Sequence, residues 1–254
     1  AVHNYASLHR SALPQNSSAS NDRRLSWATK ILPFIEQDGI YQQIDQNQIW
    51  AANASGCRNR TLAQTVVPTF VCPSGPRAGE LVTIQDPSDS SQTFTAAPGD
   101  YTIAGGFYYS TSPANYFEGA LRTLNVGVRR LTDLTDGASN TMLFAEIADK
   151  TALWRAGFMA SGPATKTFND SNNGAWANPN NNNLRGWDVS GNVQFGPYII
   201  NRQNQAAPYA FHPSGAHVLM GDGVVLFLNE DATAEAVKRL VTFQTGDLYT
   251  GENS

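Results

Sequence analysis

Residues 211–228 read FHPSGAHVLMGDGVVLFL and contain the side chains of this sequence that come closest to an acid–base pair. His212 precedes Asp222 with nine residues between them, and Gly223 follows the aspartate. A histidine beside a carboxylate can accept and pass on a proton, but only when the two groups lie within hydrogen-bonding distance. Whether this pair is catalytic therefore depends on the elements that position it.

Two turn signals in this segment place His212 and Asp222 apart. One is the Pro-Ser-Gly run at 213–215, and the other is Asp222 with Gly223. The pattern predicts a meander of three strands, at residues 207–212, 216–220 and 224–229. Its middle strand would span about 17 Å, at about 3.4 Å per residue. We therefore interpret His212, Gly215, Asp222 and Gly223 as turn residues, with the catalytic dyad as the alternative.

The remaining residues do not predict catalysis. The sequence contains no G-x-S-x-G, H-E-x-x-H, G-x-x-x-x-G-K-[ST] or G-x-G-x-x-G motif. It has only four histidines, at positions 3, 9, 212 and 217. We expect a protein that is not an enzyme.

Two polar segments offer oxygen atoms that could surround a hard cation. Asp133, Asp136 and Glu146 flank TDGASNT, and Asp170, Asn172 and Gly174 lie in NDSNNGAW. The second segment is similar to the start of a calcium loop but lacks the bidentate glutamate at position 12 of such loops. These segments predict a structural, calcium-like ion held by oxygens; the alternative is that the side chains bind their own turns.

The two cysteines, Cys57 and Cys72, have neither metal-binding spacing nor the C-x-x-C spacing of redox motifs. They are the sole pair in a chain of secreted appearance, so we predict a disulfide between them. Two free thiols are the alternative.

The composition indicates an extracytoplasmic protein with a weakly charged surface. Hydrophobic residues make up 41% of the 254 residues, enough for a core, while charged residues make up only 15%; about 25% is usual. The net charge is −4 and no basic run exceeds two residues, so we expect neither nucleic acid nor an anionic membrane as partner. No run of 18 apolar residues occurs that could span a bilayer.

The order of the predicted elements indicates one α+β domain over residues 1–254. Helical patterns come first, short strand-like segments follow, a polar loop occupies 161–193, and a helix closes the chain. The predicted helices cover residues 1–13, 26–46 with a break near Pro33 or Gly39, 60–65 and 231–243. The predicted strands, besides the meander, cover residues 66–74, 81–85, 93–97, 101–109 and 141–146.

Six segments together resemble a known family. They are AVHNYASLH (1–9), LSWATKILPFIEQDGIYQQID (25–45), VPTFVCPS (67–74), GDYTIAGG (99–106), LTDLTDGASNTMLFAE (131–146) and HPSGAHVLMGDGVVLFL (212–228). In this order they resemble the planctomycete family of pilin-like or pseudopilin-like secreted proteins, whose core is a domain of unknown function. The last segment is similar to the family's H-x9-D-G signature.

The resemblance implies a type IV pilin-like fold in which an N-terminal helix packs on an antiparallel sheet with large loop insertions and a C-terminal helix. It also implies a prepilin leader and a hydrophobic stem helix upstream of Ala1, which would be the only part that meets the membrane. The expected function is that of a subunit of a type IV pilus-like or type II secretion-like filament at the cell surface. The expected partners are sister subunits or secretion-system components.

A surface carbohydrate-binding module is the alternative function. Aromatic side chains near Asn-rich loops suit sugar rings, although most of them could equally belong to the core. The candidates are Tyr108, Tyr109, Tyr116, Trp176 and Trp187.

Overall fold

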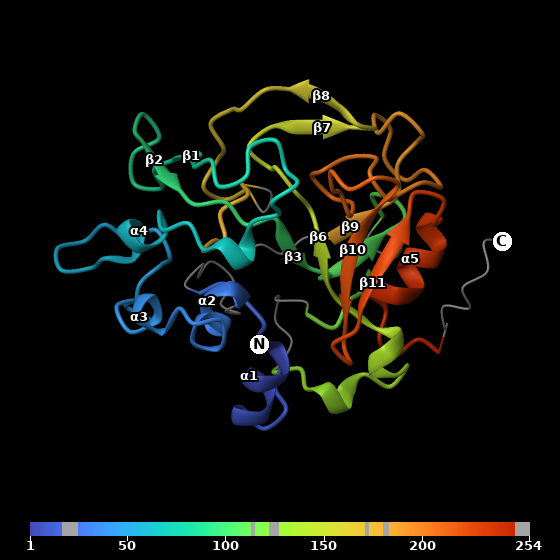
Figure 1. Cartoon of the computed structure of the whole chain (residues 1–254), viewed down its shortest axis with the longest axis horizontal. Coiled ribbons are helices and arrows are strands. Elements are labelled where there is room, and N and C mark those ends of the chain that lie inside the picture. The colour runs from blue at the N-terminus through green and yellow to red at the C-terminus, as the bar shows by residue number, and fades with distance from the viewer. Residues whose placement is uncertain (17–24, 113–114, 122–126, 171–172, 180–182, 247–254) are drawn as a thin grey trace.

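The computed structural model describes residues 1–16, 25–112, 115–121, 127–170, 173–179 and 183–246. It shows short helices and mostly antiparallel strands, which confirms the predicted α+β class (Figure 1). None of the helices in these ranges is both long and apolar enough to cross a membrane.

The central sheet has four strands, all antiparallel, in the order β11-β10-β6-β3. Their bounds are Tyr101–Ile103 for β3, Met142–Glu146 for β6, Gly215–Met220 for β10 and Val225–Asn229 for β11. All five residues of β6 are buried, because its apolar run MLFAE lies between two strands and two hydrophobic clusters. This strand carries Glu146 at its end, inside the protein.

The predicted meander is correct for two of its three strands. β10 and β11 form the expected hairpin, and Gly223 has the positive φ of 92° that the turn requires. Residues 207–212 are not a strand of this sheet, because β6 occupies the other edge of β10. Tyr209 instead makes a single parallel bridge to Ile147, just beyond β6.

Smaller strand groups surround the central sheet. β4 (Gly106–Tyr108) pairs with β5 (Tyr116–Glu118) and with β9 (Asn183–Arg185). The remaining strands form two hairpins, β1 (Val82–Gln85) with β2 (Thr93–Ala96) and β7 (Leu153–Arg155) with β8 (Phe158–Ser161). The single strand predicted at 101–109 is therefore two strands, β3 and β4, in different sheets.

The helices are shorter than the sequence pattern predicts. α1 covers only Val2–Leu8, because Arg10 and Ser11 adopt positive φ angles of 54° and 65° that end it. The segment predicted as a strand at 66–74 contains a 3-10 helix, which starts at Pro68 where a backbone donor is missing. The bounds of the remaining helices are Trp27–Ile31 (α2), Leu32–Phe34 (η1), Asp38–Tyr41 (α3), Asn59–Leu62 (α4), Pro68–Phe70 (η2), Leu131–Asp133 (η4), Ala138–Asn140 (η5) and Ala234–Val241 (α5).

Two hydrophobic clusters meet at the central sheet. One contains Trp27, Phe70 and Phe144, and it joins α2 and η2 to β6. The other contains Met142 with Val237 and Leu240 of α5, whose apolar stripe packs as predicted. Figure 1 accordingly shows α1–α4 on one side of β6 and α5 on the other.

Candidate functional site

The end of β6 brings together side chains from three distant parts of the chain. Glu146 is the last residue of β6, and its side chain is only 1% exposed. Around it lie Cys72, which follows η2, His212, which precedes β10, and His217 of β10. We call these four residues the Glu146 cluster.

The pairing of β6 with β10 positions His217 beside Glu146. Val218 faces Ala145 in this antiparallel ladder, so the neighbouring residues Glu146 and His217 also come together. The backbone N–H of His217 donates to Glu146 Oε2 over 3.2 Å, and its ring Nδ1 lies 3.4 Å from the same oxygen. One carboxylate oxygen is thus held by β10.

The other carboxylate oxygen faces His212. Glu146 Oε1 lies 3.2 Å from His212 Nε2, and His212 Nδ1 lies 3.4 Å from Ser74 Oγ. The rings of His212 and His217 meet edge to face with their centroids 4.9 Å apart. The side chains of the two histidines are 26% and 42% exposed, so the cluster reaches solvent through them.

Cys72 completes the cluster from the opposite side. Its Sγ lies 3.7 Å from His212 Nε2, and burial raises the pKa of its thiol to about 12. The backbone N–H of Cys72 donates to Asp100 Oδ2 over 2.8 Å, while Asp100 Oδ1 accepts the N–H of Asp149 over 2.9 Å. Burial raises the pKa of Asp100 to about 6. Asp100 therefore ties the loop after η2 to the loop after β6.

This arrangement is not that of a Cys-His-Glu catalytic triad. In a triad one ring nitrogen takes the proton of the nucleophile and the other is held by the acid. Here both Cys72 Sγ and Glu146 Oε1 lie near the same nitrogen, Nε2 of His212. Within the part of the chain that the structure describes, Cys72, Glu146 and His212 are a set whose ligand atoms all lie within 4.8 Å of one another.

The residues predicted to lie in turns make different contacts in the structure. Asp222 Oδ1 accepts the N–H of Val224 over 3.0 Å within its own turn, and Gly215 lies directly against the Leu228 carbonyl. His212 does not bond to Asp222; its ring faces Glu146. Sequence reasoning names Glu146 only as a possible oxygen ligand beside TDGASNT and does not bring it together with His212 or Cys72.

The predicted disulfide between Cys57 and Cys72 is wrong, since both cysteines are free. Cys57 is half-buried in the turn before α4, where its N–H donates to the Ala54 carbonyl. Cys72 is buried and directs its Sγ to His212. Each thiol is thus held in a local environment that does not include the other.

Among the carboxylates predicted to bind a hard cation, those of Asp133 and Asp136 are engaged by backbone amides. Asp133 Oδ2 accepts the N–H of Arg130 over 2.8 Å. Asp136 accepts the N–H groups of Thr245 and Gly246 over 2.9 and 3.0 Å, and so anchors the chain after α5. The carbonyl of Asp170 accepts from the side chain of Asn178, whereas Asn172 lies outside the described residues.

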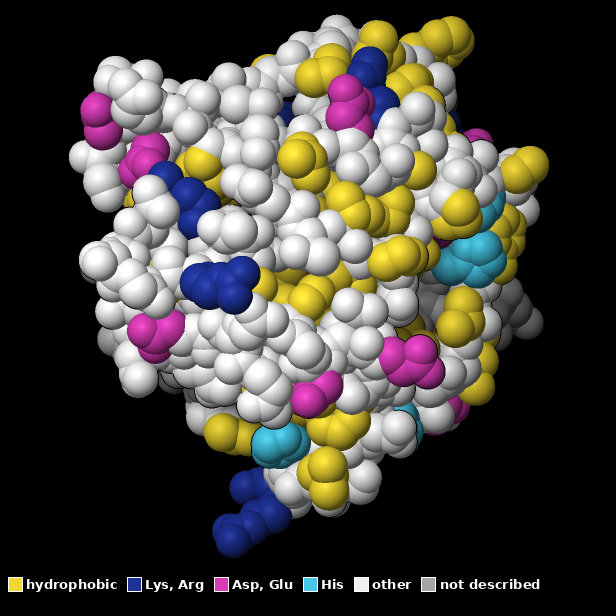
Figure 2. Space-filling view, turned by 60° about the vertical axis from the view of Figure 1, so that its left-hand side comes forward, with side chains coloured by type: hydrophobic (Ala, Val, Ile, Leu, Met, Phe, Trp, Pro, Cys, Tyr) yellow, Lys and Arg dark blue, Asp and Glu magenta, His cyan; other side chains and the backbone are white. Residues whose placement is uncertain are grey.

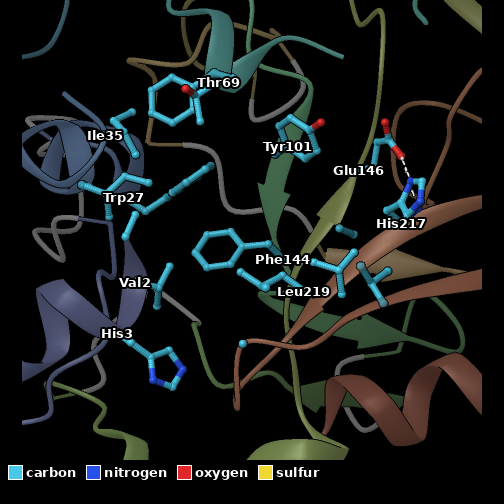
Figure 3. Close-up of a pocket in the computed structure, with 17 residues that line it drawn as sticks. Val2, His3, Trp27, Ile35, Thr69, Tyr101, Phe144, Glu146, His217 and Leu219 are labelled. Atoms are coloured by element: carbon cyan, nitrogen blue, oxygen red, sulfur yellow. Dashed lines mark hydrogen bonds and ion pairs between the residues drawn. The ribbon is translucent and has the colours of Figure 1, made fainter. Parts of the chain in front are cut away.

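An apolar hollow of about 350 Å³ adjoins the Glu146 cluster. Figure 3 shows it extending from Val2 and His3 at one end to Thr69 and Tyr101 at the other, with Phe144 and Leu219 between them. Glu146 and His217 line one side. The hollow thus lies between α1, α2 and the face of the central sheet.

A family model described as a protein of unknown function (DUF1559) matches residues 1–235. The chain therefore belongs to the DUF1559 family. No curated protein and no solved structure matches it.

Proposed function

We propose that this DUF1559 protein is a non-enzymatic, extracytoplasmic subunit of a pilin-like or pseudopilin-like filament. The observation that carries the proposal is the apolar hollow, which begins at the first turn of α1. In such a subunit, a hydrophobic helix that precedes Ala1 in the chain would extend α1 at its N-terminal end and lie along this hollow. Phe144 and Leu219 of the sheet would then pack on the stem as a globular head packs on a pilin helix.

The chemistry of the hollow suits such a stem. Its wall is mainly apolar, with Trp27 and Ile31 from α2 and Phe70 from η2 facing the sheet residues. An apolar helix seated there would remove this surface from water, at about 25 cal/mol per Å² of apolar area. The weakly charged surface also favours close packing between subunits. Figure 2 shows hydrophobic side chains gathered in the middle of one face, with separate charged side chains around them.

Exposed apolar side chains offer contacts for sister subunits. Leu8 at the end of α1 is 74% exposed, whereas Val2 at its start is buried. Val225 and Phe227 are exposed on β11, which is one of the two edge strands of the central sheet. Exposed apolar groups on an unpaired edge are typical of surfaces that meet another chain.

Electron microscopy of extracellular filaments, with the full-length protein labelled by antibody, tests the proposal. We expect labelled filaments with the wild type and fewer with Leu219→Glu, which places a charge in the hollow. The matched control is Val189→Glu, because Val189 is 60% exposed and does not line the hollow. Filaments free of the protein, or equal labelling with both variants, would overturn the proposal.

A carbohydrate-binding module is the second candidate, and one observation favours it. Tyr108 and Tyr116 are half-buried with their ring centroids 4.7 Å apart, and the Arg185 guanidinium lies 5.7 Å from the Tyr108 ring. Trp176 and Trp187 are only 4% and 3% exposed, so they belong to the core and offer no platform. Binding on a glycan array that is lost in Tyr116→Ala would favour this function over the filament.

A further inference from the structure

Three residues of the Glu146 cluster, Cys72, Glu146 and His212, hold their ligand atoms within 4.8 Å of one another, close enough to share one ion. A tetrahedral ion with bonds of about 2.0–2.3 Å separates its nitrogen and oxygen ligands by about 3.3 Å and its sulfur and nitrogen ligands by about 3.6 Å. The observed separations are 3.2 Å between His212 Nε2 and Glu146 Oε1 and 3.7 Å between His212 Nε2 and Cys72 Sγ. Both match the edges of such a tetrahedron.

We propose that Cys72, Glu146 and His212 bind a divalent transition-metal ion of the Zn²⁺ class. One thiolate, one imidazole and one carboxylate form a donor set that suits Zn²⁺. A calcium-type ion does not fit, since it takes six to eight oxygen ligands and this site offers one carboxylate. The site therefore differs in chemistry from the oxygen-rich segments that the sequence suggests, although Glu146 was named beside one of them.

The surroundings hold each ligand in place, as the groups around a metal site commonly do. Ser74 Oγ lies 3.4 Å from His212 Nδ1 and can accept a hydrogen bond from its N–H, which leaves Nε2 free to bind the ion. His217 holds the second oxygen of Glu146, and Asp100 holds the backbone of Cys72. His217 is thus a positioning residue rather than a ligand.

The burial of the Glu146 carboxylate favours the binding of a cation beside it. Glu146 is 1% exposed, and its ion pairs among the described residues are with His212 and His217. A buried carboxylate is costly unless it is paired or coordinates a metal. Three protein ligands would leave a fourth position on a tetrahedral ion for water.

Cobalt substitution of the full chain tests the proposal. Co²⁺ bound by a thiolate gives a sulfur-to-metal charge-transfer band in the near ultraviolet, which imidazole and carboxylate alone do not give. We expect chelator-treated protein to bind one equivalent of Co²⁺ with this band and to exchange it for Zn²⁺. Cys72→Ser should lose the band, while Cys57→Ser, the matched control for the other thiol, should keep it.

Histidine variants distinguish ligand from positioning residue. His217→Asn should weaken Zn²⁺ binding by at most about 10- to 100-fold and keep the charge-transfer band, whereas His212→Asn, which removes a ligand, should weaken it more. Both histidines are partly exposed, so these variants should fold even if Cys72→Ser does not; circular dichroism without metal checks this. Absence of stoichiometric binding by the wild type, or an unchanged band in folded Cys72→Ser, would overturn the proposal.

Discussion

The carboxylate of Glu146 lies 3.2 Å from the imidazole of His212, although 66 positions separate the two residues in the chain. The contact exists because β6 ends inside the protein and the turn before β10 passes over that end. One buried acid therefore joins the central sheet to the H-x9-D-G segment. Besides forming two turns, this segment therefore contributes a side chain, His212, to the Glu146 cluster.

We predict that Glu146→Ala destabilises the protein by about 1–3 kcal/mol, because it leaves the His217 N–H without its acceptor. Glu80→Ala is the control, since Glu80 is 56% exposed and pairs with Arg77 at 3.6 Å; it should cost less than about 1 kcal/mol. Urea unfolding in the presence of a chelator measures both without a contribution from metal. Equal midpoints for the two variants would contradict this role of Glu146.

We expect Asp222 to stabilise its own turn and to have no effect on metal binding. Asp222→Ala removes the acceptor of the Val224 N–H and should cost about 0.5–2 kcal/mol. Asp222→Asn keeps a side-chain oxygen and should cost less. Thermal melts compare the variants, and neither should alter metal binding, because Asp222 does not contact the Glu146 cluster. A change in cobalt binding on Asp222→Ala would show that the two ends of β10 are coupled.

Gly215 is required for the close approach of the hairpin strands. A Cβ at this position would lie 2.3 Å from the Leu228 carbonyl oxygen, which the β10–β11 ladder holds in place. We expect Gly215→Ala to destabilise the protein by about 1–3 kcal/mol or more. Gly162→Ala is the control, since nothing lies within 4 Å of a Cβ there. Similar chemical-denaturation midpoints for the two variants would contradict the clash.

The sequence predicts the local elements better than the site, and the residues show why. The Asp222-Gly223 pair predicts the β10–β11 hairpin, and the stripe of Val237, Leu240 and Val241 predicts the packing of α5. Each of these two signals is contained in a segment of only a few consecutive residues. By contrast, Cys72 and His212 are 140 positions apart, and no periodicity relates them. The end of α1 was missed because its left-handed residues are arginine and serine rather than glycine.

The last prediction concerns Lys150, which is only 5% exposed. Burial lowers the pKa of its ammonium group from 10.5 to about 8. Below pH 8 the lysine is charged in both states, and burying that charge destabilises the fold by up to about 3 kcal/mol. Between pH 8 and 10.5 the unfolded chain binds more protons than the folded protein, so this contribution makes the free energy of unfolding rise with pH.

Lys150→Met keeps most of the side-chain volume and removes the charge. We therefore expect the variant to be more stable than the wild type at pH 7, and its advantage to shrink as the pH approaches 10 because the wild-type lysine then folds uncharged. Urea unfolding of both proteins across this pH range gives the difference between their free energies of unfolding. Contributions from groups that titrate equally in the two proteins cancel in that difference. A stability difference that is constant with pH would mean that Lys150 keeps its charge in the folded protein without penalty. The coulombic attraction of Asp100 and Asp170, which acts against the burial, would then balance it.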